Sequence, residues 1–350
     1  MTPEQAAATL AEIAYLLRHQ GDQHRARAFT RVAGMLVRDR PDLVVLSTAG
    51  QLETLDGVGS GIARTLSELV ETGQSSYLDR LRAEVGTADQ PVAAAGEAAR
   101  TSLQGYRGDL HCHTDWSDGG ATVLAMAEAA RARGYEYLAI TDHSPRIVVT
   151  NGLGPERLAA QRRLIDEANR RLPGITILQG CEVDILEDGS LDLPDETLAA
   201  LDLVIASPHV KLRMERGQMT ERMLRAVEHP LVTIVGHPTG RRPGSRPGAD
   251  YDYEAVFRAA AARSLVLEID CDPARMDLSP ELAALAARLG CRLSLDSDAH
   301  APDQFVYTDL GIWSAQRAGI STDRIVNWLP LEQLRKEVLQ GRGVPRPPDG

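Results

Sequence analysis

The sequence predicts an α/β protein in which a parallel barrel follows a small all-α domain. From residue 106 onward, short apolar segments typical of strands alternate with helical patterns. Seven strands connected in this way form a parallel sheet, and the simplest closure of that sheet is a barrel. The first 86 residues instead show apolar side chains at helical spacing. A chain of 350 residues is long enough for two such domains.

Composition restricts the classes of function. No apolar run reaches 18 residues and no secretory signal is visible at the N-terminus, so we expect no membrane span and a cytoplasmic location. The four cysteines lie far apart and form no Cys-x-x-Cys pair, which fits reduced thiols in that compartment. A net charge of −11 argues against non-specific capture by polyanions, so any contact with nucleic acid must be local.

Residues 1–86 are predicted to form the helical domain. The stretch Thr-Pro-Glu-Gln at residues 2–5 is typical of a helix start, with an N-cap, a proline in the first turn and a capping-box glutamine. A second helix has its apolar residues on one face, and residues 18–40 around it hold four more positive than negative charges. A last helix is expected from Ser76 to Gly86.

Residues 52–66 are predicted to form a helix, a glycine hairpin and a second helix. Gly57 and Gly59 permit a tight turn, and the next helix, with Gly61 in its first turn, begins with free backbone N–H groups. Such groups suit a phosphate oxygen, so these three glycines are the candidate DNA-binding residues. The alternative is a protein-interaction module whose glycines only form turns. A net charge of −3 over residues 1–105 weighs against DNA.

The second domain is predicted to span residues 106–340. Its expected strands are 108–113, 137–142, 175–184, 202–207, 232–237, 264–271 and 291–298, and the expected helices between them include 121–133, 155–171, 218–228, 252–263 and 280–289. Residues 302–340 are expected to add helices that close the barrel. Residues 87–105, rich in Ala, Gly and polar residues, are predicted to be a linker, and residues 341–350 a disordered tail.

Histidines gather where the predicted strands end, which is where barrels of this kind place their sites. Six of the nine histidines lie there, next to carboxylates: His111, His113, His143, His209, His237 and His300. The other three, His19, His24 and His229, are interpreted as surface or helix-end residues. Six histidines at equivalent positions favour a metal site over a set of structural histidines.

His111 and His113 belong to one short predicted strand, in which alternate side chains share a face. Both imidazoles therefore point the same way, whereas Cys112 points into the barrel wall. Taken by itself, this pair is equally consistent with two solvated loop histidines. The carboxylates and histidines at the other strand ends favour metal binding.

These motifs resemble the PHP (polymerase and histidinol phosphatase) domain, in the variety found at the C-terminus of bacterial family X DNA polymerases. The resemblance covers residues 107 to about 330. It rests on His-x-His, Ser-Asp-Gly, Thr-Asp-His-Ser, Gly-x-Glu, Pro-His, Gly-His-Pro-Thr-Gly-Arg, Leu-Glu-Ile-Asp-Cys and Asp-Ser-Asp-Ala-His, in family order. Residues 4–85, with Gly-Val-Gly followed by Ile-Ala, resemble the helix-hairpin-helix domain of the same polymerases. The family implies a distorted (β/α)7 barrel of the TIM type with three metal ions.

Position within these motifs implies three sets of metal ligands. They are His111, His113, Glu182 and Asp298 for the first metal; Glu182, His209 and His237 for the second; and Asp118, His143 and His300 for the third. Imidazole nitrogens and carboxylate oxygens without a thiolate suit Mn²⁺, Zn²⁺ or Fe²⁺. The resemblance therefore implies hydrolysis of a phosphoester by water that the metals activate, with Glu182 as the shared, catalytic carboxylate.

Arginines near such a site would stabilise the charge of the phosphoryl oxygens. Arg241, in Gly-His-Pro-Thr-Gly-Arg, is the first candidate, followed by Arg246 and Arg275. Each of the three is equally consistent with a structural ion pair in a loop.

Carboxylates next to the ligands are expected to orient the ligand histidines. Asp142 and Asp270 are the first candidates, and Asp184 and Glu268 follow them.

The leading functional hypothesis is a metal-dependent phosphoesterase acting on DNA ends, as a 3′-phosphatase or 3′→5′ exonuclease in DNA repair. The second is a small-molecule phosphatase of the histidinol-phosphatase kind, which the acidic charge fits better. The third is a non-catalytic DNA-end binding protein. Polymerase activity is not expected, because a linker at 87–105 cannot contain a polymerase palm. The first domain has no lysine, so Schiff-base lyase activity is not expected either.

Overall fold

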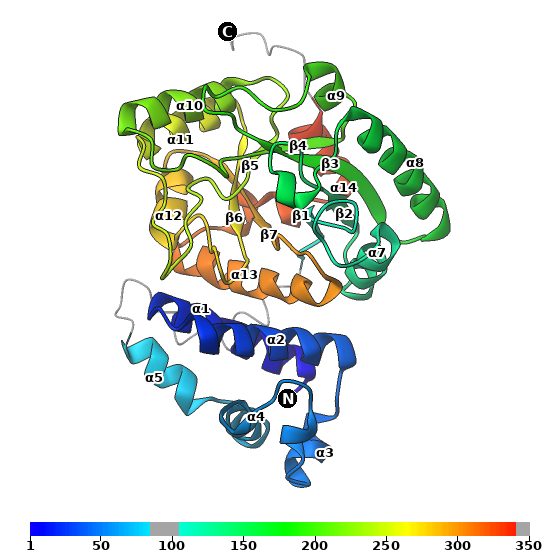
Figure 1. Ribbon diagram of the computed structural model, residues 1–350, viewed down its shortest axis with the longest axis vertical. Helices are drawn as coiled ribbons and strands as arrows, with labels where there is room; N and C mark the ends of the chain where they lie inside the picture. Colours follow the sequence, from blue (N-terminus) through cyan, green and yellow to red (C-terminus); the bar gives the residue numbers. More distant parts are fainter. Residues whose placement is uncertain (85–104, 341–350) are drawn as a thin grey trace.

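Seven parallel strands form one sheet in which each strand pairs with its neighbours in the sequence. A computed structural model describes residues 1–84 and 105–340 of the chain (Figure 1). The strands are β1 (Gly108–Cys112), β2 (Tyr137–Ile140), β3 (Thr176–Asp184), β4 (Leu203–Ser207), β5 (Ile234–Val235), β6 (Val266–Asp270) and β7 (Arg292–Asp296). Every strand lies inside its predicted range, and the predicted barrel is confirmed.

Helices connect the strands and cover the outside of the barrel (Figure 1). They are α7 (Val123–Ala132), α8 (Pro155–Arg171), α9 (Asp195–Ala199), α10 (Arg216–Glu228), α11 (Tyr253–Ala262) and α12 (Pro280–Arg288). The sequence predicts all of these except the short α9. The last part contains α13 (Thr308–Arg317), α14 (Leu331–Leu334), the 3₁₀ turns η3 (Pro302–Tyr307), η4 (Thr322–Arg324) and η5 (Val326–Trp328), and the π-turn η6 (Arg335–Leu339).

Side chains close the barrel between β1 and β7. The backbone N–H of Leu110 donates to Oδ1 of Asp296 over 2.9 Å, and the N–H of Ser297 donates to Asp109 over 3.2 Å. The amide of Asn327, from η5, donates to the same Oδ1 of Asp296 over 2.8 Å. Burial, and then the neighbouring Asp296, raises the pKa of Asp109 to about 8. Buried carboxylates thus supply acceptors where a regular strand ladder would supply carbonyls.

Within residues 1–84, the helices are α1 (Pro3–His19), α2 (Gln23–Asp39), α3 (Leu43–Thr48), α4 (Ser60–Thr72) and α5 (Ser76–Glu84). The predicted capping box is present at α1, where the N–H of Gln5 donates to Oγ1 of Thr2 over 3.2 Å and the reverse bond measures 3.0 Å. The expected end of α5 at Gly86 lies outside the described residues.

The prediction of a helix that begins at Leu52, before the glycine hairpin, is wrong. The chain from Leu52 forms only a 3₁₀ turn, η1 (Leu52–Thr54), and the helix before the hairpin is α3, which ends ahead of Gly50. Gly50 has a φ of +67° and Gly57 a φ of +74°. These two residues in the left-handed conformation lie on either side of residues 51–56, which have room for a single turn. The second helix of the hairpin, α4, is where the sequence predicts it.

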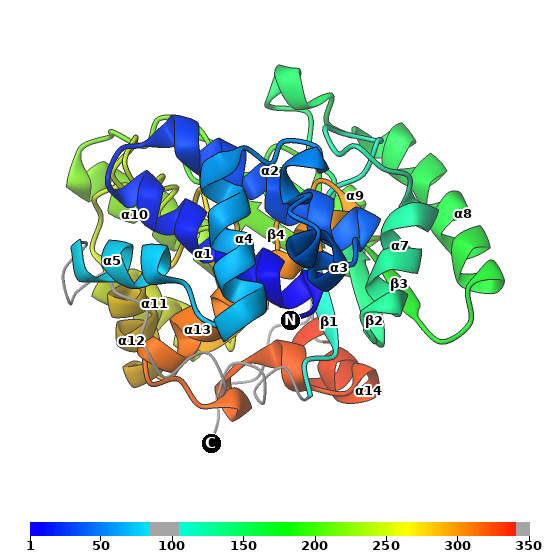
Figure 2. The same cartoon turned by 90° about the horizontal axis from the view of Figure 1, so that it is seen from below.

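The N-terminal helices pack against the barrel. Helix α2 contacts η3, and α1 contacts both η3 and α13 (Figures 1 and 2). Gly34 of α2 lies so close to Asp303 of η3 that a Cβ at position 34 would overlap the carboxylate. The guanidinium of Arg38 is 4.0 Å from that carboxylate. One buried apolar cluster includes residues of both parts, so η3 lies between the helical part and the barrel.

Two predicted segments fall outside the described residues. These are the linker at 87–105, apart from Gly105, and the tail at 341–350. In the part of the chain that the structure describes, no helix combines the length and the apolar character that crossing a bilayer requires.

Candidate metal centre

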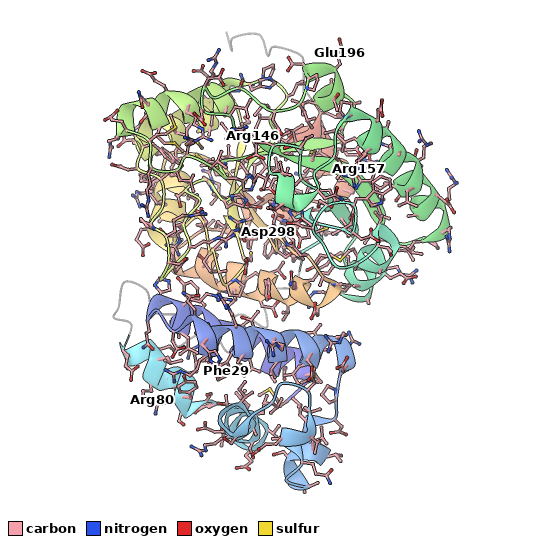
Figure 3. The ribbon with its side chains drawn as sticks, in the orientation of Figure 1. Phe29, Arg80, Arg146, Arg157, Glu196 and Asp298 are labelled. Carbon is pink, nitrogen blue, oxygen red and sulfur yellow. The ribbon has the colours of Figure 1, made fainter. Side chains whose placement is uncertain are left out.

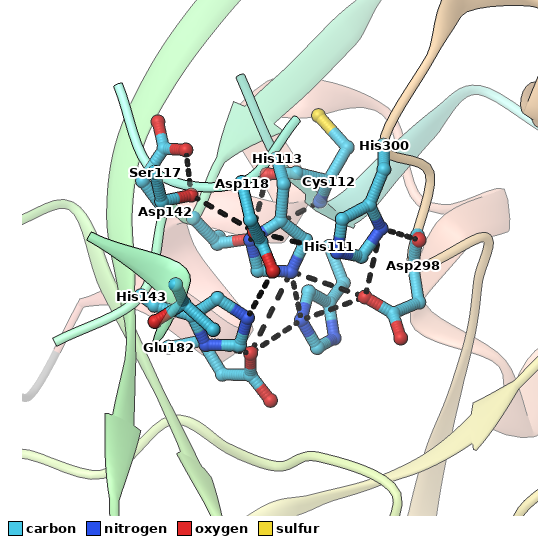
Figure 4. A network of polar contacts seen from close by, with 12 residues as sticks. His111, Cys112, His113, Ser117, Asp118, Asp142, His143, Glu182, Asp298 and His300 are labelled. Atoms are coloured by element: carbon cyan, nitrogen blue, oxygen red, sulfur yellow. Dashed lines mark hydrogen bonds and ion pairs between the residues drawn. The ribbon is translucent and has the colours of Figure 1, made fainter. Parts of the chain in front are cut away.

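The predicted metal ligands converge at the carboxyl ends of the strands, and Figure 4 shows the part of the network around His113, Glu182 and Asp298. His111 belongs to β1, and His113 and Asp118 follow it; Glu182 belongs to β3. The remaining ligands lie in the loops just after β2, β4, β5 and β7: His143, His209, His237, Asp298 and His300. Parallel strands bring these positions to one end of the barrel, although they are up to 189 residues apart in the sequence.

The carboxylate of Glu182 lies at the centre of the cluster. Its Oε1 is 2.6 Å from Nε2 of His237 and 3.0 Å from Nε2 of His209. Its Oε2 is 2.9 Å from Nδ1 of His143 and 3.5 Å from Nε2 of His111. Burial opposes ionisation, but these imidazoles together hold the pKa of Glu182 well below its usual range. Glu182 is therefore a carboxylate that faces histidines from four different strand ends.

His111, His113 and Asp298 form one group of potential ligands. Nε2 of His113 is 3.2 Å from Nε2 of His111 and 3.0 Å from Oδ1 of Asp298. It is also 3.5 Å from Oε2 of Glu182. The sequence predicts these four residues as the ligands of the first metal, and the structure brings them together.

Asp118 forms a second group with His143, His300 and His113. Its Oδ2 is 3.5 Å from Nε2 of His143, and its Oδ1 is 3.5 Å from Nε2 of His300. The rings of His143 and His300 stack against His113, with centroids 4.4 and 4.3 Å apart. A third group contains His143, Glu182 and His209, so His143 faces Asp118 with one ring nitrogen and Glu182 with the other. The division of ligands among individual metals stays a prediction.

The cluster has the chemistry of a divalent-cation site. Two buried ring nitrogens, Nδ1 of His113 and Nδ1 of His237, make no hydrogen bond within the described residues. Burial is the main cause that lowers the pKa of His113 and of His237 to about 3, so both rings are neutral and have a free lone pair. Burial opposes protonation of His143, but the carboxylate of Glu182 raises its pKa to about 10, so the acidic side chains of the cluster favour positive charge at this position.

Thiols take no part in the cluster. Cys112 directs its Sγ to the carbonyl of Ala139 over 3.3 Å, and Cys181 directs its own to the carbonyl of Asp142 over 3.2 Å. Both are buried in the barrel wall, as predicted. A donor set of nitrogen and oxygen suits Mn²⁺, Zn²⁺ or Fe²⁺ and not a soft ion such as Cu⁺.

Comparisons with known proteins agree with this site. The family model for the PHP domain matches residues 109–263. A protein named as a probable phosphatase from Photobacterium profundum is 33% identical over 203 residues, which are 55% of this chain and 77% of that protein. The chain belongs to the PHP domain family. A "Probable phosphatase" from Syntrophotalea carbinolica is 30% identical over 63% of this chain and 90% of its own length.

The part before the PHP barrel matches a second family model, the helix-hairpin-helix domain, over residues 1–75. "DNA polymerase/3'-5' exonuclease PolX" from Bacillus subtilis is 38% identical over 228 residues. These residues are 65% of this chain but only 40% of the polymerase. A solved histidinol phosphate phosphatase from Lactococcus lactis, complexed with zinc, L-histidinol and phosphate, matches 62% of this chain and 95% of its own, with a TM-score of 0.44 and 19% identity.

Two buried carboxylates orient histidines of the PHP centre. Nδ1 of His111 is 2.7 Å from Oε1 of Glu268, and Nδ1 of His209 is 3.1 Å from Oδ1 of Asp184. When Nδ1–H donates to a carboxylate, the lone pair of Nε2 is left to face the cluster. The sequence ranks Glu268 and Asp184 behind Asp142 and Asp270 as candidates for orienting a histidine, because strand spacing alone does not show which carboxylate reaches a ring.

The prediction that Asp142 and Asp270 orient ligand histidines is wrong. Asp142 accepts hydrogen bonds from the backbone and hydroxyl of Thr114, over 2.8 and 2.6 Å, and from the amide of Gln161 over 2.6 Å. It therefore holds the loop that follows His113. Asp270 lies 3.3 Å from Nε of Arg275 and pairs with that guanidinium instead of with an imidazole.

The three candidate arginines have different surroundings. Arg275 is buried, with Nε 3.2 Å from Asp298, and its neighbouring carboxylates raise its pKa although burial opposes this. Arg241 donates from Nε to the carbonyl of Arg275 over 3.1 Å, and its Nη2 is buried without a hydrogen-bond partner among the described residues. Arg246 donates from Nε to the carbonyl of Gly240 over 2.8 Å.

The sequence missed Arg242, which follows Arg241 in the same loop. Burial, and then Arg275, lowers the pKa of Arg242, and the carboxylates of Asp272 and Asp298 oppose this shift. A position next to a motif arginine was the signal that could have identified it. Arg242 thus adds to the positive charge beside Asp298.

The hairpin glycines lie at the start of α4. Gly59 is its N-cap and makes no side-chain capping bond, and the first helical bond starts at the N–H of Ala63. A Cβ at Gly59 or Gly61 would meet no atom within 4 Å, so space next to the free N–H groups is open. Arg31 lies beside the turn, since its Cδ would be 3.5 Å from a Cβ at Gly57.

Proposed function

We propose that this phosphoester hydrolase of the PHP family acts on phosphate esters at DNA ends, as a 3′-phosphatase or 3′→5′ exonuclease in DNA repair. The observation that supports this most is the presence, in one chain, of a PHP centre and a helix-hairpin-helix part with an uncapped helix N-terminus. Free N–H groups at a helix start bind phosphate oxygens. A relative that is 38% identical over 228 residues of this chain is named for a DNA activity, 3′-5′ exonuclease.

The predicted ligands would hold divalent ions in this site. We propose three ions, held by His111, His113, Glu182 and Asp298; by Glu182, His209 and His237; and by Asp118, His143 and His300. Such ions, when bound, supply positive charge to the phosphate oxygens and acidify water.

The residues of the chain have separate roles in this proposal. Glu182 holds the histidines of different strand ends in one place, and Glu268 fixes which nitrogen of His111 faces the centre. Arg275 positions Asp298 through its ion pair. Arg241 has a buried N–H that finds no hydrogen-bond partner in residues 1–84 and 105–340, and this N–H is available to a phosphoryl oxygen as charge develops there.

A small-molecule phosphatase of the histidinol-phosphatase kind is the second candidate. Two observations favour it: the net charge of −11 and the relatives named as probable phosphatases. The PHP centre would perform the same chemistry on either substrate, so only the choice of phosphoester separates the two candidates.

One experiment separates these functions. The full-length protein is supplied with Mn²⁺ and offered a 3′-labelled recessed duplex, a 3′-phosphorylated duplex and histidinol phosphate in parallel, with Glu182→Gln as the inactive control. We expect turnover of at least one DNA substrate at a higher kcat/KM than that of histidinol phosphate. Turnover of histidinol phosphate alone would refute the DNA proposal.

A charge at the start of α4 is expected to weaken DNA binding. We predict that Gly61→Asp lowers the affinity for a gapped duplex about tenfold at low salt, because the carboxylate repels the phosphate that the helix N-terminus would bind. Gly61→Ala is the matched control, since a Cβ at this position meets no atom within 4 Å. An aspartate in the first turn also favours the helix, so unfolding would not explain the loss. Equal affinity of the two variants in a filter-binding assay would refute this role of the hairpin.

A further inference from the structure

Two valines are almost fully exposed in the segment that follows the metal-ligand candidate His143. Val148 and Val149 form the 3₁₀ turn η2 (Val148–Thr150), and their exposed fractions are 86% and 90%. They are the most exposed large apolar side chains in the described part of the chain. Figure 2 shows the green turn that contains them projecting beyond the rest of the barrel. Exposed apolar side chains next to a site are typical of a binding surface.

The turn projects from a fixed base. The N–H of Leu153 donates to the carbonyl of His143 over 2.6 Å, so the two ends of the segment meet beside the metal centre. A Cβ at Gly152 would overlap the backbone of Ser144, which brings the two ends into direct contact. The guanidinium of Arg157 donates to the carbonyl of Gly152 over 3.1 Å, at the base of the turn (Figure 3). The valines are therefore held in place and do not belong to a fraying loop.

Positive charge lies next to the valines. Arg146, two residues before Val148, has Nη2 3.9 Å from Oε1 of Glu187. Lys211, two residues after the ligand candidate His209, has Nζ 4.0 Å from the same oxygen. All three side chains are about half exposed or more, so two cations share one carboxylate at the edge of the site. The carboxylate of Asp192 accepts the backbone N–H of Arg146 over 2.9 Å, so Arg146 and Lys211 share this edge with two carboxylates, Glu187 and Asp192.

We propose that this edge binds the terminal nucleotide of a DNA strand, with its base packed on Val148 and Val149. The backbone phosphates of the strand lie against Arg146 and Lys211. An apolar surface beside cations matches a nucleotide, which joins an apolar base face to an anionic backbone. The inference rests on the proposed function and adds to it: the hairpin at α4 binds DNA away from its end, whereas the valines contact the end itself.

The test compares two ends that differ only in the base. Full-length protein with Mn²⁺ hydrolyses single-stranded oligonucleotides with a 3′-phosphate, ending either in thymine or in an abasic sugar, and para-nitrophenyl phosphate serves as a substrate with no nucleotide. We expect the double variant Val148→Ser/Val149→Ser to lower kcat/KM on the thymine end about tenfold. The abasic end and para-nitrophenyl phosphate should change less than about twofold. Leu164→Ser, a change of one exposed apolar residue on α8, is the control for lost surface hydrophobicity.

Each other outcome has a separate meaning. Equal losses on the thymine and abasic ends would overturn base packing, and so would unchanged activity on both. Hydrolysis of para-nitrophenyl phosphate but of no oligonucleotide by the wild type would refute the proposed function, and this inference with it. Light scattering compares the oligomeric state of the wild type and the double variant. A dimeric wild type and a monomeric double variant would show that the valines contact a second copy of the chain, which would overturn the proposal.

Discussion

Glu182→Gln is expected to abolish phosphoester hydrolysis, with a loss of about a thousandfold or more in kcat. Glutamine keeps the size of the side chain but replaces one anionic oxygen by an NH₂ group, which is a donor and not a ligand. That group would face imidazole nitrogens that now lie 2.6–3.5 Å from the carboxylate. The cluster would lose its central negative charge, and the metal content per chain, measured by mass spectrometry, should fall together with kcat.

Glu187→Gln is the matched control for this variant. It removes one glutamate charge from the same part of the chain, but its carboxylate is half exposed and does not belong to the cluster. We expect its metal content and its activity on para-nitrophenyl phosphate to remain unchanged. Full activity of Glu182→Gln on that substrate would rule out a central role of this carboxylate.

Deleting residues 1–104 is expected to reduce the activity of the barrel and its stability. Helices α1 and α2 pack on η3, and Gln304 of η3 accepts the backbone N–H of His300 over 2.7 Å. The helical part thus supports the segment that follows a metal-ligand candidate. Loss of this packed interface exposes apolar surface, so the melting temperature of the barrel should fall by about 10 °C. Activity on para-nitrophenyl phosphate should fall severalfold, whereas independent domains would leave it unchanged.

A point substitution tests the same contact in the full chain. Gly34→Val places a branched side chain against Asp303, where even a Cβ would overlap the carboxylate. Gly61→Val makes the same change in a helix where a Cβ meets no atom within 4 Å. We expect only the first variant to lose melting temperature and activity on para-nitrophenyl phosphate. Equal behaviour of the two variants would contradict a supporting role of α2.

Much of the barrel was predictable because its local signals agree with each other. Strand β3 contains the ligand candidate Glu182 and β7 lies just before the ligand candidate Asp298, and helices such as α8 start at a proline. The hairpin was less predictable. Leu52 has an apolar side chain, but the left-handed glycines Gly50 and Gly57 leave room there for one turn only. Periodicity over so few residues does not distinguish a turn from a helix.

The hydrogen-bond partners of the site residues are contacts that the sequence does not predict. Asp142 is adjacent to His143 in the sequence, yet it binds the loop at Thr114. Glu268 is 157 residues from His111, yet it holds that ring. Adjacent residues in a strand point to opposite faces, so a neighbour in sequence is a poor candidate for the partner of a histidine. The same holds for Arg275, whose pairing with Asp298 no spacing indicates.

By itself, the sequence determined the order of the strands, the residues at their ends and the kinds of ligand atoms that they offer. It did so because strand periodicity and motif spacing are local properties, and because parallel strands bring their ends together in any closed barrel. The tertiary structure alone decided which carboxylate holds which imidazole, and that α2 packs on η3. It also decided that Val148 and Val149, in the turn that follows His143, are almost fully exposed. These are distances between segments remote in sequence, which depend on how the closed barrel places its loops.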